Sequence, residues 1–107
     1  MRWIHRIHGM DIRSVDLNLL VIFDAMARQR SVSRTAEAVG LSQPATSAAL
    51  ARLRALFDDP LFVRAGAQME PTPRAVELAP AVHRMVDILR TEILQQAAFE
   101  WRRRGDL

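Results

Sequence analysis

The sequence of 107 residues contains no cysteine and no lysine. Without cysteine it can form no disulfide, thiol nucleophile, iron–sulfur cluster or cysteine-rich zinc site. No apolar run approaches the roughly 18 residues that a membrane span requires, and residues 1–10 lack the apolar core of a signal peptide. We therefore expect a cytoplasmic protein with no membrane partner.

All of the basic charge is carried by arginine. The 15 arginines face 12 acidic residues, which leaves a formal net charge of +3. Six arginines lie between residues 28 and 64 with only three acidic residues among them, whereas residues 72–100 hold three arginines and four acidic residues. The planar guanidinium forms forked hydrogen bonds with phosphate and guanine. The basic half of the chain is therefore the candidate nucleic-acid surface.

Capping and spacing signals predict three short helices in the first half of the chain. Asp16 is a suitable N-cap for the first helix, which should end near residues 28–30. Ser31 is a suitable N-cap for the second, and Gly40 follows it where a tight turn requires a positive φ. Ser42 begins the third. Two short helices that meet at a glycine turn beside a first helix indicate a helix-turn-helix.

The second half of the chain predicts a β-hairpin and a long helix. A helix break at residues 58–60 is followed by two short strands around a turn. The first strand is expected at residues 61–64, the turn at 65–68 and the second strand at 69–70. Thr72 followed by Pro73 is a strong helix start, and Pro80 should bend this helix locally.

These elements predict a mainly α fold, a winged helix-turn-helix of three helices and a small β-hairpin wing, followed by a long linker helix. The expected divisions are a basic N-terminal extension at 1–15, a DNA-binding domain at 16–72 with its helix-turn-helix at about 31–57 and its wing at about 61–70, a linker helix at 73–98 and a tail at 99–107.

The start of the third helix carries side chains suited to reading DNA. Gln43 can pair with adenine through two hydrogen bonds, and Ala45 and the methyl group of Thr46 can contact thymine methyl groups. Hydroxyl and arginine side chains at the start of the second helix can bind phosphate. The candidates that the residues themselves indicate are Ser33, Arg34, Gln43, Ala45, Arg52 and Arg64.

An apolar stripe follows the long helix at intervals of three and four residues. Its members are Leu78, Val82, Met85, Leu89 and Ile93. Such a stripe can pack on its own domain, as most do, or on a second copy. At about 1.5 Å per residue the helix would be roughly 37 Å long. A domain this small cannot cover its whole length, which favours a dimer seam.

Neither an enzyme nor a metal site is indicated. His5 and His8 lack the further ligands of a metal site, and His83 is expected at the edge of the buried face of the long helix. Asp58 and Asp59 before a proline are typical of a helix stop. The sequence offers no nucleophile beside a base and no glycine-rich phosphate loop, so we expect no cofactor.

Several of these segments together resemble the DNA-binding domain of LysR-type transcriptional regulators, over about residues 15–95. The matching segments are DLNLL from Asp16, SVSRTAEAVGLSQPATS from Ser31, PLFVR from Pro60 and PTP from Pro71. The resemblance implies a third helix in the major groove, a wing near the neighbouring minor groove and a linker helix that pairs antiparallel with a second copy. It implies groove-facing positions for Ser42, Gln43, Pro44, Ala45 and Ser47. It implies positions near phosphates for Ser33, Arg34 and Thr72.

The chain departs from the family pattern at three places. Ala48 stands where many members carry an arginine. Thr46 replaces a larger aliphatic residue, which predicts looser packing beneath the third helix. The wing tip at residues 65–68 lacks a common arginine, which predicts weak reading of the minor groove, whereas Arg64 is retained at the wing base.

We expect from these features a homodimeric module of a bacterial transcriptional regulator that binds an inverted-repeat operator in double-stranded DNA, at the nucleoid. The alternative is a helical interaction module that forms mixed dimers through the long helix and binds little DNA itself. We expect neither the effector-binding domain typical of the family nor a small-molecule site within these 107 residues. A fragment of a longer protein, a truncated reading frame and a complete DNA-binding protein all agree with the sequence.

Overall fold

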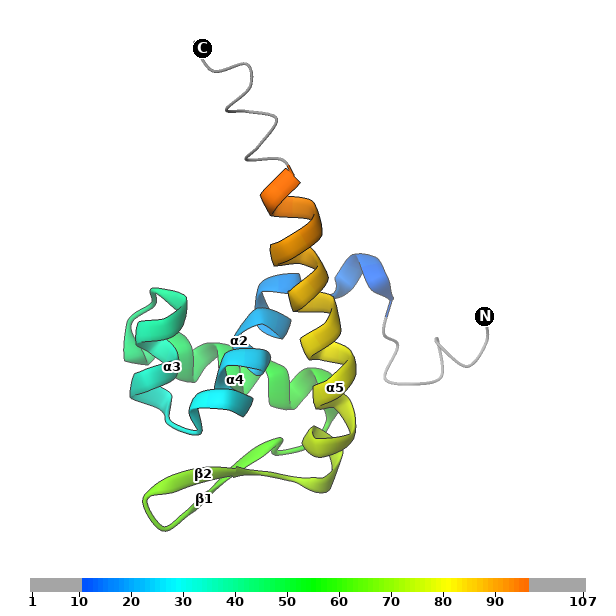
Figure 1. The fold of residues 1–107 in the computed structure, drawn as a ribbon. Coiled ribbons are helices and arrows are strands. Elements are labelled where there is room, and N and C mark those ends of the chain that lie inside the picture. The colour runs from blue at the N-terminus through cyan, green and yellow to red at the C-terminus, as the bar shows by residue number, and fades with distance from the viewer. Residues whose placement is uncertain (1–10, 97–107) are drawn as a thin grey trace.

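The computed structural model describes residues 11–96, a helical body with a hairpin at one end and a long helix leading away from it (Figure 1). The elements are the 3-10 helix η1 (Ile12–Ser14), α2 (Leu17–Gln29), α3 (Val32–Val39), α4 (Gln43–Phe57), β1 (Phe62–Ala65), β2 (Gln68–Pro71), α5 (Pro73–Ile88) and the π-helix η2 (Leu89–Leu94). Most of the predicted basic extension, with His5 and His8, lies outside the described residues, as do the end of the predicted linker helix and the tail. The described end of this extension forms η1, which Asp11 caps by accepting the Arg13 N–H at 2.9 Å.

Each of the four α-helices begins where the sequence predicts. The predicted N-cap side chain accepts a hydrogen bond from a backbone N–H two or three residues further on, which satisfies a donor that the helix start leaves free. The pairs are Asp16 with Asn18, Ser31 with Arg34, Ser42 with Ala45 and Thr72 with Ala75.

The first three α-helices end at a residue in the left-handed backbone conformation. Gly40 ends α3 at φ 73°, as the sequence predicts, and fits there without strain because it has no Cβ. Arg30 ends α2 at φ 55° and Asp58 ends α4 at φ 51°. Aspartate adopts this conformation more readily than most residues, whereas arginine disfavours it. Other contacts must therefore hold the backbone of Arg30 in place.

The core lies between α2 and the elements that surround it. The ring of Phe23 in α2 lies 5.3 Å from that of Phe62 in an edge-to-face arrangement and 6.5 Å from that of Phe57, measured between ring centroids. Such aromatic pairs stabilise a core beyond the area that they bury. Phe23 therefore joins α4 and the base of the wing to the first α-helix.

Thr46 packs on the inner side of α4. Its side chain is fully buried, and its hydroxyl donates to Ser42 O at 2.9 Å. Because the buried hydroxyl has a partner, this residue fastens the first turn of α4. Because the side chain faces the core, its methyl group is not available to a thymine, and this part of the sequence prediction is corrected. The looser packing expected beneath this helix stays a prediction.

The wing is an antiparallel pair of strands that projects from the helical body (Figure 1). Ala65 pairs with Gln68, so only Gly66 and Ala67 form the turn, which is shorter than the sequence predicts. Gly66 has a φ of 63°, as a two-residue hairpin turn requires.

The predicted start of the first strand is displaced by one residue. Leu61 has a φ of 62°, and the Phe62 N–H donates to Pro60 O around it at 2.6 Å. A hydrogen bond across three residues with a positive φ at the centre is a γ-turn, which is strained and cannot belong to a strand. The chain thus turns sharply between α4 and the wing, and Leu61 is completely buried there.

The long helix is continuous from α5 through η2 to residue 96 and extends beyond the helical body (Figure 1). Pro80 lies within α5 without ending it. The sequence does not predict the π-helical turn, in which Thr91 Oγ1 donates to Asp87 O at 2.7 Å. Within residues 11–96, none of the helices combines the length and apolar character needed to cross a membrane.

Candidate nucleic-acid interface

The wing and the starts of α3 and α4 enclose a polar groove of about 270 Å³. We call it the wing groove and define it by the residues Arg30, Ser31, Ser33, Gln43 and Arg64. Three residues that the sequence predicts to contact DNA line this groove, and each comes from a different element. They are Ser33 in α3, Gln43 in α4 and Arg64 in β1.

The start of α4 presents a small and uncharged exposed surface. Gln43, Pro44, Ala45 and Ser47 are all exposed, and within the described residues the side chains of Gln43 and Ser47 form no hydrogen bond. Both are therefore available to an external partner. The hydroxyl of Ser42 accepts the Ala45 N–H at 3.2 Å and so serves the helix itself.

The start of α3 places two hydroxyl groups together at the edge of the same groove. Ser31 Oγ accepts the Arg34 N–H at 3.2 Å and lies 3.1 Å from Ser33 Oγ. Ser33 and Arg34 are exposed. Hydroxyls, a guanidinium and the free N–H groups of a helix start are the donors that bind a phosphate in protein–DNA contacts.

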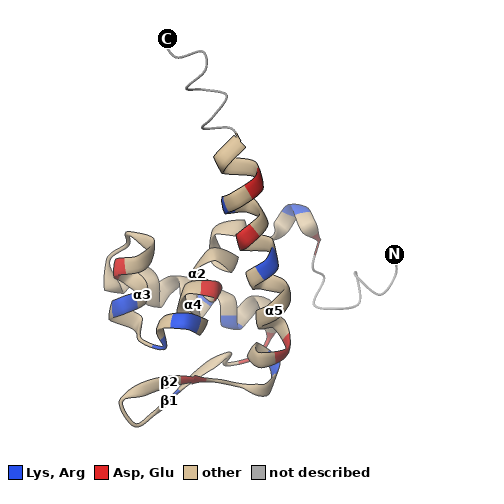
Figure 2. Ribbon diagram, viewed as in Figure 1, with Lys and Arg blue, Asp and Glu red and all other residues tan. Residues whose placement is uncertain are grey.

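Most arginines of the basic half already form ion pairs or hydrogen bonds with other residues of the same chain. The contacts are Arg28 with Asp24 at 3.1 Å, Arg30 with Glu70 at 3.3 Å, Arg52 with Asp16 at 3.5 Å, and Arg54 with the carbonyl oxygens of Pro60 and Phe62 at 2.8 Å each. By contrast, Arg34 and Arg64 form no ion pair with any residue from 11 to 96. Acidic positions are interspersed with the basic ones along these elements (Figure 2). The charge count therefore overstates the number of arginines that are free for phosphate.

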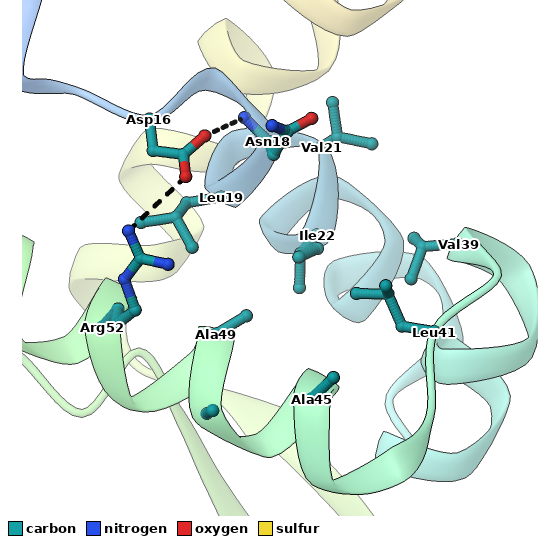
Figure 3. Close-up of a pocket in the computed structure, with 11 residues that line it drawn as sticks. Asp16, Asn18, Leu19, Val21, Ile22, Val39, Leu41, Ala45, Ala49 and Arg52 are labelled. Carbon is teal, nitrogen blue, oxygen red and sulfur yellow. Dashed lines mark hydrogen bonds and ion pairs between the residues drawn. The ribbon is translucent and has the colours of Figure 1, made fainter.

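Arg52 lies away from the wing groove. It marks one end of an apolar groove of about 450 Å³ between α2 and α4, where its guanidinium points toward the carboxylate of Asp16 (Figure 3). Asp16 also caps α2 by accepting the Asn18 N–H at 2.9 Å. Arg52 therefore does not lie beside the other predicted DNA contacts, although its side chain is 64% exposed.

Thr72 also forms hydrogen bonds within the fold. Its hydroxyl donates to Asp59 Oδ2 at 2.7 Å and accepts the Ala75 N–H at 3.2 Å. The same Asp59 oxygen accepts the Leu61 N–H at 2.8 Å. The hydroxyl of Thr72, and after it the N–H of Leu61, lower the pKa of Asp59. Thr72 and Asp59 therefore hold the junction of α4, the wing and α5, which explains why Asp59 stands before the proline.

The apolar stripe of the long helix divides between the core and the surface. Val82 is buried in the core of its own domain, and Leu78 and Met85 pack against that core while partly exposed. The idea that Val82 faces a second copy is therefore corrected, because the helix turns this position toward α2. Ile93 is 55% exposed, and Leu89 is half-buried.

Arg30 lines the wing groove but is not among the residues predicted to contact DNA. The only sequence signal is its place in the basic half, directly before the N-cap Ser31. Its bonds to the wing depend on residues about 40 positions further along the chain, such as Glu70. Local sequence patterns cannot reveal such contacts.

Helices α2 to α4, a two-stranded wing and a long helix, in this order, define a winged helix-turn-helix protein. Residues 17–76 match the family described as "Bacterial regulatory helix-turn-helix protein, lysR family". The chain belongs to this family.

Two relatives illustrate the similarity in sequence. Over 91 residues, 85% of this chain and 30% of the relative, the chain is 48% identical to the HTH-type transcriptional activator NahR of Pseudomonas putida. Over 82 residues, 77% of this chain and 26% of the relative, it is 44% identical to the HTH-type transcriptional regulator LeuO of Escherichia coli (strain K12). The chain thus spans less than a third of the length of these relatives.

Solved structures share the fold. The probable transcriptional regulator PA0477 from Pseudomonas aeruginosa superposes with a TM-score of 0.73 at 44% identity, over 85% of this chain and 29% of that chain. The BenM_DBD/catB site 1 DNA complex superposes with a TM-score of 0.69 at 16% identity, over 80% of this chain and 97% of that chain. At this low identity the second likeness concerns the fold alone.

Proposed function

We propose that this chain is the DNA-binding module of a bacterial transcriptional regulator and that it recognises a specific sequence in double-stranded DNA. The observation that carries the proposal is the wing groove, where Ser33, Gln43 and Arg64 meet on one surface. The family match and the names of NahR and LeuO support a regulatory role. The fold shared with BenM_DBD, which was solved with DNA, supports DNA as the partner.

In this proposal the start of α4 reads the bases. Gln43 and Ser47 supply hydrogen bonds to base edges in the major groove, and Pro44 and Ala45 supply apolar contacts. Ser42 caps the helix by accepting the Ala45 N–H, and its hydroxyl hydrogen can still be donated to an acceptor on DNA.

Phosphate contacts supply the affinity that does not depend on sequence. Ser33 and Arg34 hold one phosphate at the start of α3, and Arg64 holds another from the wing. These two arginines are our candidates because they form no ion pair within the described part of the chain. Arg52 is a weaker candidate that must leave Asp16 to bind, and Thr72 acts only through the wing junction.

We further propose that two copies pair through the long helix and bind an inverted repeat, as two-fold symmetry requires. Four of the exposed and half-buried apolar positions of α5 follow one another at intervals of three and four residues, which suits the packing of one helix along another. They are Leu78, Ala81, Met85 and Ile88. Beyond them, Ile93 and Leu94 are more than half exposed. This seam keeps Leu78, Met85 and Ile93 of the predicted stripe. It replaces Val82 with its neighbour Ala81 and Leu89 with its neighbour Ile88.

Selection of bound sequences from a random pool of DNA duplexes tests the function. We expect enrichment of an inverted repeat with half-sites about one helical turn, roughly 34–36 Å, apart. The protein would then act in the cytoplasm, at the nucleoid. A dimer in sedimentation that enriches no sequence and shifts no DNA at low salt would overturn DNA binding. That result would favour a helical interaction module, for which exposed Ile88, Ile93 and Leu94 are the supporting observation.

A further inference from the structure

The backbone of Arg30 is held in an unfavourable conformation next to the wing. Its φ of 55° and ψ of 29° are left-handed, where glycine is the usual residue at the end of a helix. An arginine that persists in such a conformation indicates that surrounding contacts hold it there, and that its side chain has a use.

Both the backbone and the side chain of Arg30 bond to strand β2. The Met69 N–H donates to Arg30 O at 2.9 Å, and Arg30 Nη1 donates to Glu70 Oε2 at 3.3 Å. Within residues 11–96 these are the hydrogen bonds that join β2 to the helices. The base of the wing is held separately, by the bonds from Arg54 to Pro60 O and Phe62 O.

The hydrogen bond between Met69 and Arg30 affects the position of Arg64. Met69 is the cross-strand partner of Arg64 in the wing. Because the N–H of Met69 points outward to Arg30, this is a non-hydrogen-bonded pair, in which the two side chains lie closer together than in the alternative arrangement. Any movement of β2 away from Arg30 therefore carries Arg64 away from Ser33 and Gln43 across the groove.

We propose that Arg30 is a positioning residue for DNA recognition, which holds the wing so that Arg64 faces the start of α4. This inference rests on the proposed function. Arg30 acts through Glu70 and Met69 and not by binding phosphate. Its guanidinium is 43% exposed and faces a carboxylate that is 42% exposed, so the wing already supplies its charged partner.

Amide exchange in the protein without DNA tests the positioning itself. The Met69 N–H should exchange about two- to fivefold faster in Arg30→Gln and in Glu70→Gln, since an exposed ion pair contributes about 0.2–1 kcal/mol. The charge swap Arg30→Glu with Glu70→Arg should restore slow exchange. Glu77→Gln, an exposed change on α5, is the matched control. Unchanged Met69 exchange in both single variants overturns the proposal whether or not the protein binds DNA.

Titration with the selected operator then separates positioning from phosphate contact. We expect Arg30→Gln and Glu70→Gln each to weaken binding about two- to fivefold, and neither to do so once Arg64 is alanine. The charge swap should recover affinity, and circular dichroism checks that each variant is folded. If Glu70→Gln strengthens binding while Arg30→Gln weakens it and lowers the salt slope, Arg30 binds phosphate and the proposal is wrong. Failure of the wild-type protein to bind any selected DNA contradicts the proposed function instead.

Discussion

His83 in α5 and Asp24 in α2 lie in direct contact, with 3.1 Å between His83 Nδ1 and Asp24 Oδ1. The carboxylate of Asp24 is 5% exposed, and its second oxygen lies 3.1 Å from Arg28 Nη2. A buried carboxylate requires partners because it has lost its water. The pair therefore joins the long helix to the helix-turn-helix body. In the proposed dimer, this contact would help to fix the long helix relative to α2 and so to the rest of the helix-turn-helix.

Removal of the His83 side chain should destabilise the domain. We expect His83→Ala to lower the free energy of unfolding by about 1–2 kcal/mol, because one oxygen of Asp24 is left without its hydrogen bond. Urea denaturation followed by circular dichroism measures the change. Arg84→Ala, the exposed neighbour on the same helix, is the control. Equal stability of the two variants would show that the contact does not hold α5.

Gln43 should determine sequence preference. Gln43→Ala should reduce discrimination between the selected operator and a random duplex by about 1–3 kcal/mol, the free energy of one bidentate contact with a base. Fluorescence anisotropy with both duplexes provides the measurement, and Gln95→Ala on the exposed end of the long helix provides the control. An equal loss of affinity for both duplexes would remove Gln43 from base reading.

Arg34 and Arg64 should account for the salt dependence of binding. Each change to alanine should lower the slope of log affinity against log salt by about one, and weaken binding to all sequences alike. Arg90→Ala removes the same charge from the exposed part of the long helix and should leave the slope unchanged. If Arg90→Ala lowers the slope as much as Arg64→Ala, the wing makes no special phosphate contact.

The lowered pKa of Asp59 predicts a dependence of stability on pH. Hydrogen bonds from Thr72 and Leu61 keep the pKa of Asp59 below its usual value of 3.8 in the folded protein. The stabilisation is therefore complete above that value and is lost as the pH falls through the lowered one. Asp59→Asn should remove part of the acid sensitivity of unfolding as the pH falls through and below the usual pKa of 3.8. Asp58→Asn is the adjacent control, and identical pH profiles for the two variants would contradict the role of Asp59.

The two faces of α5 should respond differently to charge. Ile88→Asp should dissociate the proposed dimer while the domain stays folded, because Ile88 is 46% exposed in the single chain. Val82→Asp should unfold the domain, since Val82 is buried in its core. Sedimentation with circular dichroism distinguishes these outcomes. A folded dimer of the Ile88→Asp variant would show that the seam lies elsewhere.

Local chemistry explains why much of the fold is predictable. Caps such as Ser31 and Ser42 act within three residues of their own position, so the sequence alone places the starts of the helices. The wing follows from a helix break, a glycine turn and a proline-led helix start. The groove-facing candidates near Gln43 are predictable for the same reason, because a helix start exposes its first turn.

Contacts between distant residues explain the features that the sequence alone does not predict. Arg52 is drawn to Asp16 and Arg30 to Glu70 by tertiary packing, which a count of charges cannot detect. The γ-turn at Leu61 depends on Asp59 and on the long-range bond from the Thr72 N–H to Leu61 O at 2.9 Å. The orientation of the apolar stripe likewise depends on how α5 packs against α2, which places Val82 inside.

Titration of the unmodified chain with two duplexes tests the central claim most directly. One duplex carries the selected inverted repeat, and the other has the same composition in shuffled order. Measured at one salt concentration, the account predicts about 10³-fold tighter binding to the inverted repeat. Equal affinity for the two duplexes would contradict sequence-specific recognition by the wing groove.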